Sequence, residues 1–131
     1  MTQKPIAIFV CLHGAAKSIV AATYFNKIAA ETGREMYAVA RGLEPDLGLS
    51  DATVNGLLHD GLAASELRPQ KLLLDELVTA QRIISFCELP EAYRGKSAIE
   101  YWEDVPPVSE SYEIARDAIL VKLKEMMQGS I

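Results

Sequence analysis

A short stretch of the sequence, residues 9–18 (FVCLHGAAKS), holds the residue types with the most distinctive chemistry. Cys11 is a strong nucleophile when deprotonated, Lys17 carries a positive charge, and Ser18 offers a hydroxyl group. Two kinds of site use such residues in this order. One is a nucleotide-binding loop that ends in Lys-Ser, and the other is an oxyanion-binding loop that begins with a reactive thiol.

The nucleotide-binding loop is the weaker interpretation. The Walker pattern G-x-x-x-x-G-K-[ST] requires glycine at its first and sixth positions, where this sequence has Cys11 and Ala16. A chain of 131 residues is also short for that class of protein.

The thiol-headed loop agrees better with the residues present. A loop that leads from a strand into a helix points several backbone N–H groups inward, and the helix dipole adds partial positive charge there. This field and the Lys17 ammonium group favour the thiolate form of Cys11. Ser18 can donate its hydroxyl to the sulfur, and Gly14 supplies a position where φ can be positive. The residues expected to bind the oxyanion are Leu12, His13, Gly14, Ala15, Ala16, Lys17 and Ser18.

The elements that must position this loop alternate between strand and helix. A continuous apolar run and helical periodicity with capping signals locate them along the chain. Such alternation predicts a parallel sheet with helices on both faces, whose ligands bind beyond the carboxyl ends of the strands. The predicted strands cover 6–10, 36–40, 82–86 and 98–101, and the predicted helices cover 17–31, 51–60, 71–80 and about 109–129.

The composition limits the classes of protein to consider. The length fits one domain, residues 1–131, and half of the residues are apolar. The net charge of −5, without a basic cluster, argues against nucleic acid and anionic membranes as partners. The N-terminus lacks the features of a signal peptide, so we expect a cytoplasmic protein. The two cysteines and two histidines form no close pair, so we expect neither a metal site nor a cofactor.

The motif at 11–18, CLHGAAKS, resembles the C-x5-R-S loop of the low-molecular-weight protein tyrosine phosphatases and the related arsenate reductases. The residues ARG at 40–42 resemble the S-A-G that follows the second strand in this family, and RPQKLLLDEL at 68–77 resembles its R-P-K-x-L-T-x-E-L region. RIISFC at 82–87 and YWEDVPP at 101–107 stand where the family has its third strand and its W-x-x-x-D-P segment. The resemblance implies a single three-layer α/β domain with a four-stranded parallel sheet in the order 2-1-3-4.

The resemblance also implies an activity. Cys11 would attack phosphate, arsenate, or a phosphorylated small molecule or protein, as the nucleophile of a phosphatase or of an arsenate-reductase-like enzyme. The arginine of the family loop is Lys17 here, and the aspartate that acts as general acid aligns with Pro106. Asp104, two residues earlier, is therefore the candidate acid. The alternative is a non-catalytic protein that binds an oxyanion or a phosphorylated ligand in the same loop.

Two further residues have two interpretations each. Cys87 ends the third predicted strand, next to the first, and is either a buried inert residue or a redox partner of Cys11. The resemblance supports the second role, because thioredoxin-coupled arsenate reductases use a cysteine here and depend on a thiol reductant. Those enzymes have another cysteine seven residues further along the chain, and Arg94 occupies that position in this sequence. His13 either bonds to backbone or corresponds to a histidine found in some arsenate reductases of this fold.

Overall fold

The sheet has four parallel strands in the order β2-β1-β3-β4, as predicted. The structure is a computed structural model, and it describes residues 5–64, 67–95 and 98–128. Helical segments connect the strands that follow one another along the chain, as parallel strands require. The strands are β1 (Ala7–Cys11), β2 (Ala38–Gly42), β3 (Arg82–Ser85) and β4 (Ile99–Tyr101).

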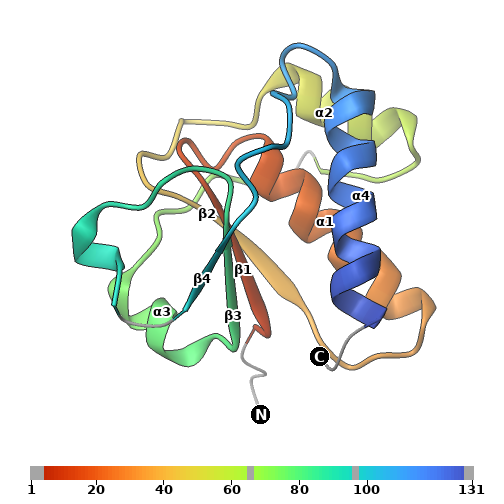
Figure 1. Cartoon of the computed structure of the whole chain (residues 1–131). Helices are drawn as coiled ribbons and strands as arrows, with labels where there is room; N and C mark the ends of the chain where they lie inside the picture. The colour runs from red at the N-terminus through yellow and green to blue at the C-terminus, as the bar shows by residue number, and fades with distance from the viewer. Residues whose placement is uncertain (1–4, 65–66, 96–97, 129–131) are drawn as a thin grey trace.

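Helices cover both faces of the sheet, which confirms the predicted α/β fold. Figure 1 shows α1 and α4 side by side on one face, with α2 next to their upper ends. No helix in the described ranges is long and apolar enough to cross a membrane. The helices are α1 (Lys17–Glu31), α2 (Asp51–His59), α3 (Leu74–Thr79) and α4 (Tyr112–Gln128), and a short 3₁₀ helix, η1, covers Glu91–Tyr93.

Strand β1 lies at the centre of the core, because all five of its residues are buried. Its side chains alternate between the two faces of the sheet. Phe9 packs against Phe25 and Trp102 on the face covered by α1 and α4, with ring centroids 6.1 and 5.7 Å apart. Ile8 and Leu77 belong to a separate apolar cluster on the opposite face. Cys11 shares the side of Phe9, so its thiol faces the start of α1.

Asp60 connects three helices just beyond α2. Its carboxylate accepts hydrogen bonds from Tyr24 of α1 and, at 2.9 Å each, from Tyr112 Oη and Arg116 Nη1 of α4. Burial alone would raise the pKa of Asp60, but these three donors together lower it below its usual value. The network therefore stabilises the packing of α4 against α1 through a charged carboxylate.

Helix α1 has the predicted bounds, whereas other elements begin later than expected. The strand predicted at 36–40 is observed at 38–42. The helix predicted at 71–80 begins at Leu74, because Lys71 forms a bridge with Gly42 and Leu72 N donates to Gly42 O at 2.9 Å. The segment therefore extends the edge of the sheet before it turns into a helix.

The last helix also begins later than predicted. It starts at Tyr112 rather than near Ser109, because the hydroxyl of Ser111 accepts a hydrogen bond from Ile114 N at 3.2 Å and so caps the first turn. Its predicted end at Gly129 lies outside the described residues.

Candidate active site

Backbone hydrogen bonds fix the loop of residues 12–16, which joins β1 to α1. The last carbonyl group of β1 and three carbonyl groups of this loop accept N–H groups from the segment 43–50, which follows β2. Because these carbonyls point outward, the N–H groups of the same loop are turned toward the other side. The four bonds are Leu43 N to Cys11 O (3.3 Å), Glu44 N to Leu12 O (2.8 Å), Asp46 N to His13 O (3.1 Å) and Ser50 N to Ala15 O (3.1 Å).

The N–H groups of residues 12–16 donate to no acceptor in the described part of the chain. Those of Lys17 and Ser18 belong to the first turn of α1, where a helix has no internal acceptors for its N–H groups. Unpaired backbone donors are rare in the interior of proteins, and several that converge at a helix start bind anions. We call residues 11–18 the cradle.

Glycine is required at two positions where the cradle touches β2. Gly14 has a φ of 61°, which confirms the expected positive value. A Cβ atom on Gly14 would lie 2.9 Å from Gly42 N, and one on Gly42 would lie 2.6 Å from Gly14 N. Both distances are shorter than real contacts allow, so either side chain would push the loop away from the sheet.

Cys11 lies at the base of the cradle, beside the hydroxyl of Ser18. The two side-chain atoms, Sγ and Oγ, are 3.0 Å apart, and Cys11 is only 8% exposed. This is the contact that the sequence predicts if Ser18 holds the thiolate. The catalytic roles of both residues remain predictions.

A pocket of about 330 Å³ opens above Cys11. Most of the cradle forms its floor, and Asp46 and Ser50 come from the segment that the cradle carbonyls bind. Phe86 and Cys87 contribute from the end of β3, and residues 107–109 close the pocket from the segment before α4. The volume is at the lower end of the usual range for small-ligand sites.

Lys17 lies in the wall of this pocket. Its Nζ donates to Val105 O at 2.7 Å, which ties the start of α1 to the segment before α4. An ammonium group has three donors, so two remain for an oxyanion. Contact between Lys17 and the oxyanion remains a prediction.

The structure does not bring Asp104 to the pocket. Its Oδ1 lies 3.1 Å from Lys122 Nζ on α4, and its side chain is 75% exposed. The hydrogen bond with Lys122 lowers the pKa of Asp104, whereas a general acid at neutral pH needs a raised one. Neither the position nor the charge state of Asp104 supports the predicted role.

Cys87 lines the same pocket as Cys11, and both cysteines are free thiols. Burial raises the pKa of Cys87, with the charge of Cys11 adding to the effect, so its thiol is less readily ionised than a solvent-exposed one. The structure thus places the two thiols at the carboxyl ends of the neighbouring strands β1 and β3, as expected. Their redox pairing remains a prediction.

The sequence predictions did not include Asp46, which also lines the pocket. An acidic residue in a Gly- and Pro-rich loop directly after the second strand was the available signal, since the first and second strands end at the same edge. Its Oδ1 lies 3.4 Å from His13 Nδ1. His13 Nδ1 is also 3.2 Å from Glu44 O, so His13 does bond to backbone.

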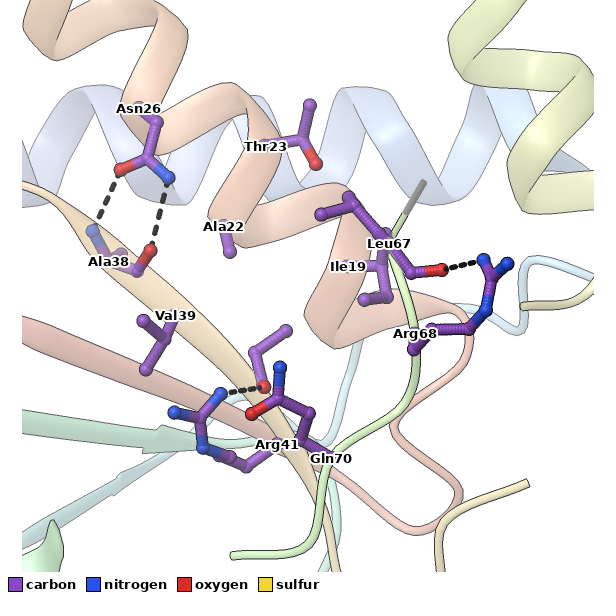
Figure 2. Close-up of a pocket in the computed structure, with 11 residues that line it drawn as sticks. Ile19, Ala22, Thr23, Asn26, Ala38, Val39, Arg41, Leu67, Arg68 and Gln70 are labelled. Atoms are coloured by element: carbon purple, nitrogen blue, oxygen red, sulfur yellow. Dashed lines mark hydrogen bonds between the residues drawn. The ribbon is translucent and has the colours of Figure 1, made fainter. Parts of the chain in front are cut away.

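A second pocket, of about 300 Å³, lies between α1, β2 and residues 67–70 (Figure 2). None of the predicted catalytic or oxyanion-binding residues lines it. Asn26 uses its side-chain amide to bond both Ala38 N (2.7 Å) and Ala38 O (3.0 Å). Arg41 is paired with Glu76 at 2.8 Å. These polar groups serve the fold. Within the described ranges, no three His, Cys, Asp or Glu side chains gather as metal ligands would.

Comparison with known proteins finds the fold but no similar sequence. No protein-family model and no curated protein matches the chain. YfkJ from Bacillus subtilis superposes with a TM-score of 0.82 at 18% identity, over 97% of this chain and 94% of that one.

Two more solved structures carry functional descriptions. SP-PTP, a low-molecular-weight protein tyrosine phosphatase from Streptococcus pyogenes, has a TM-score of 0.79 at 14% identity, over 93% of this chain and 90% of its own. An arsenate reductase from Archaeoglobus fulgidus has a TM-score of 0.70 at 22% identity, over 94% of this chain and 99% of its own. The chain therefore has the fold of the low-molecular-weight protein tyrosine phosphatases and arsenate reductases.

Proposed function

We propose that this protein is a cysteine-dependent phosphatase that hydrolyses phosphate monoesters through a phosphorylated Cys11. The observation that carries the proposal is the cradle itself. A buried thiol faces a run of backbone N–H groups that have no acceptor in the described chain. Such a loop suits a dianionic tetrahedral group placed directly over the sulfur.

The chemistry follows from this arrangement. The Cys11 thiolate attacks phosphorus, the bond to the leaving oxygen breaks, and water then releases phosphate from the sulfur. The cradle N–H groups and Lys17 neutralise the charge on the three equatorial oxygens in the transition state. Ser18, 3.0 Å from the sulfur, stabilises the thiolate when it leaves.

Turnover of an aryl phosphate and isolation of the phosphorylated enzyme test the proposal together. We expect the intact protein to hydrolyse p-nitrophenyl phosphate slowly and, after an acid quench, to carry one phosphoryl group on the peptide that contains Cys11. Cys11→Ser should reduce turnover by about three orders of magnitude or more, as loss of a nucleophile does in other enzymes. A wild type as inactive as Cys11→Ser would contradict the proposal.

Anion binding separates the enzyme from the non-catalytic alternative. Phosphate, sulfate and arsenate should each raise the melting temperature of Cys11→Ser as well as of the wild type, in proportion to the logarithm of their concentration. Binding without turnover in the wild type would favour the binding protein. No thermal shift at tens of millimolar anion would argue against the cradle in either role.

A second candidate function, arsenate reduction, is favoured by one observation: Cys87 lines the pocket of Cys11. In this reaction Cys11 would bond to arsenic with loss of water, and Cys87 would then attack Cys11 Sγ. The S–As bond would break, leaving its electron pair on arsenic, so that a disulfide forms and arsenite is released. An added dithiol would then reduce the disulfide. Arsenite production that requires both cysteines and a dithiol supports this function. Peptide mapping without a Cys11–Cys87 disulfide, after arsenate or mild peroxide, would exclude it.

A further inference from the structure

A phosphatase needs a group that gives a proton to the leaving oxygen, and the predicted acid is turned away from the pocket. The following inference rests on the proposed function. The titratable side chains that line the pocket within the described residues are Cys11, His13, Lys17, Asp46 and Cys87. Cys11 is the nucleophile, Lys17 is bound to Val105 O, and burial raises the pKa of Cys87, which makes its thiol a poorer proton donor. His13 and Asp46 remain.

His13 and Asp46 come from two segments that the backbone joins. Asp46 N donates to His13 O at 3.1 Å, so the positions of the two residues are fixed relative to each other. Their side chains also meet, with Asp46 Oδ1 3.4 Å from His13 Nδ1. Both side chains are about half exposed, at 53% and 54%, and so lie at the mouth of the pocket rather than at its base.

The contacts of His13 determine which ring nitrogen can exchange a proton. A backbone carbonyl can only accept a hydrogen bond, so the 3.2 Å contact with Glu44 O requires the hydrogen to be on Nδ1. Nε2 is then the basic nitrogen of the neutral ring and a donor in the charged one. It forms no hydrogen bond with any described residue. The Asp46 carboxylate, 3.4 Å from Nδ1, holds the ring in this orientation, as in other carboxylate–histidine pairs.

The mouth of the pocket is also where a leaving group must be. Thiolate attack on phosphorus is in line, so the leaving oxygen is opposite the sulfur. Cys11 is 8% exposed at the base, which directs the leaving oxygen outward. The titratable groups that line the pocket with His13 are Asp46 from the segment after β2, Lys17 from α1, and the two cysteines at the ends of β1 and β3.

We propose that His13 is the general acid and base of the reaction and that Asp46 is its positioning residue. In the first step Cys11 Sγ bonds to phosphorus, the P–O bond to the leaving group breaks, and that oxygen takes the proton from His13 Nε2. In the second step water bonds to phosphorus, the S–P bond breaks to restore the thiolate, and His13 Nε2 takes a proton from the water. The net reaction is hydrolysis of the ester, with His13 returned to its charged form.

Leaving-group dependence tests this role, because a poor leaving group needs the proton and a good one does not. The substrates are phenyl phosphate and 2,4-dinitrophenyl phosphate, compared in the full-length protein. We expect His13→Gln to lower kcat/KM for phenyl phosphate by about a hundredfold or more, because kcat/KM reports the step in which the leaving oxygen departs. The same variant should lower kcat/KM for the dinitrophenyl ester less than about fivefold. Loss of the base in the second step, which both esters share, should lower kcat for both.

Matched variants separate His13 from its neighbours. Asp46→Asn leaves the cradle sequence intact. It should lower kcat/KM for the phenyl ester by about tenfold and leave kcat/KM for the dinitrophenyl ester nearly unchanged. Asp46→Glu should recover part of that loss. His59→Gln, at the exposed end of α2, should behave as wild type with both esters. We expect kcat/KM of the wild type for phenyl phosphate to fall at high pH as the general acid loses its proton, and His13→Gln to lose this fall.

Four results would overturn the inference. If His13→Gln and Asp46→Asn each lower kcat/KM equally for both esters, the two residues act through the shape of the cradle. Wild-type rates in both variants would mean that they play no part. A loss confined to the phenyl ester in Asp104→Asn instead would restore Asp104 as the acid. If the wild type shows no Cys11-dependent hydrolysis of either ester, the proposed function itself is wrong, and the inference fails with it.

Discussion

The two sides of the pocket are held in different ways. The cradle, residues 11–18, is bound by four backbone hydrogen bonds to the segment 43–50 and by the close contact of Gly14 with Gly42. The segment of residues 102–109, whose last three residues line the pocket and which we call the C-terminal wall, is held mainly by side chains. Trp102, Val105 and Val108 are buried in the core, and the Lys17 side chain of the cradle donates a hydrogen bond to Val105 O.

This difference determines what each side can contribute. Backbone groups that are fixed by other backbone groups present N–H donors in one geometry, whatever the side chains are. Side chains on the C-terminal wall face where their individual partners direct them, as Asp104 does toward Lys122. We therefore expect substitutions on the cradle side to change anion binding strongly, and substitutions on the C-terminal wall to change it weakly.

The largest effect should follow from Gly42→Ala. The new Cβ atom would lie 2.6 Å from Gly14 N, so the cradle must move away from β2. We expect a loss of about 1–3 kcal/mol in the free energy of unfolding, as for other overpacked sites, and no thermal shift with phosphate. Gly48→Ala, where a Cβ atom meets nothing within 4 Å, is the control and should change stability by no more than about 0.5 kcal/mol. A phosphate shift that survives in Gly42→Ala would show that the cradle is not rigid.

We expect Lys17→Arg to have a smaller effect, which is an increase in kcat. A guanidinium group binds two equatorial oxygens through a planar fork, whereas the ammonium group acts as a point charge. One added charge-assisted hydrogen bond in the transition state corresponds to about 1.5–3 kcal/mol, or about ten- to a hundredfold in kcat. Phosphate affinity in the ground state should change far less. A variant that binds phosphate normally but turns over no faster would mean that the ammonium group is already adequate.

Asp60→Asn tests whether the C-terminal wall depends on the packing of α4. The substitution removes the charge that Tyr24, Tyr112 and Arg116 bind, and should cost about 1.5–3 kcal/mol of stability at neutral pH without affecting phosphate binding. Because the folded-state pKa of Asp60 is lowered, its contribution is complete above the unfolded pKa of about 4 and disappears as the pH falls through the folded value. Urea titrations of both proteins should therefore converge in acid. A constant difference down to low pH would show that the carboxylate charge is not involved.

The smallest effect should come from Asp104→Asn. Its carboxylate is exposed, paired with Lys122, and outside the pocket. We expect kcat for aryl phosphates to change by less than about threefold, since exposed ion pairs contribute little to stability or positioning. Steady-state kinetics at neutral pH is the measurement. A tenfold or larger loss would mean that the C-terminal wall rearranges when substrate binds.

The same contrast explains what the sequence could predict. The bounds of α1 and the positive φ of Gly14 followed from local signals, namely helical periodicity and a glycine in a loop. The strand order followed from the resemblance of the motifs. Asp104 could not be placed, because its direction depends on Lys122, a residue of a different element. The predicted strand order already placed the end of β2 beside β1, but the contact of Asp46 with His13 depends on the path of the loop after β2, which the sequence does not show.

The hydrogen bonds of Asn26 to β2 affect whether strands of two molecules can pair. Strand β2 is at one edge of the sheet, and an edge strand exposes backbone groups that can pair with a strand from another molecule. Here the Asn26 amide bonds Ala38 N and O as a neighbouring strand would, and residues 70 and 72 bond the backbone of Gly42. The opposite edge, β4, has only three residues. With one edge occupied and the other short, the described sheet offers little free edge to which a strand of another molecule could add.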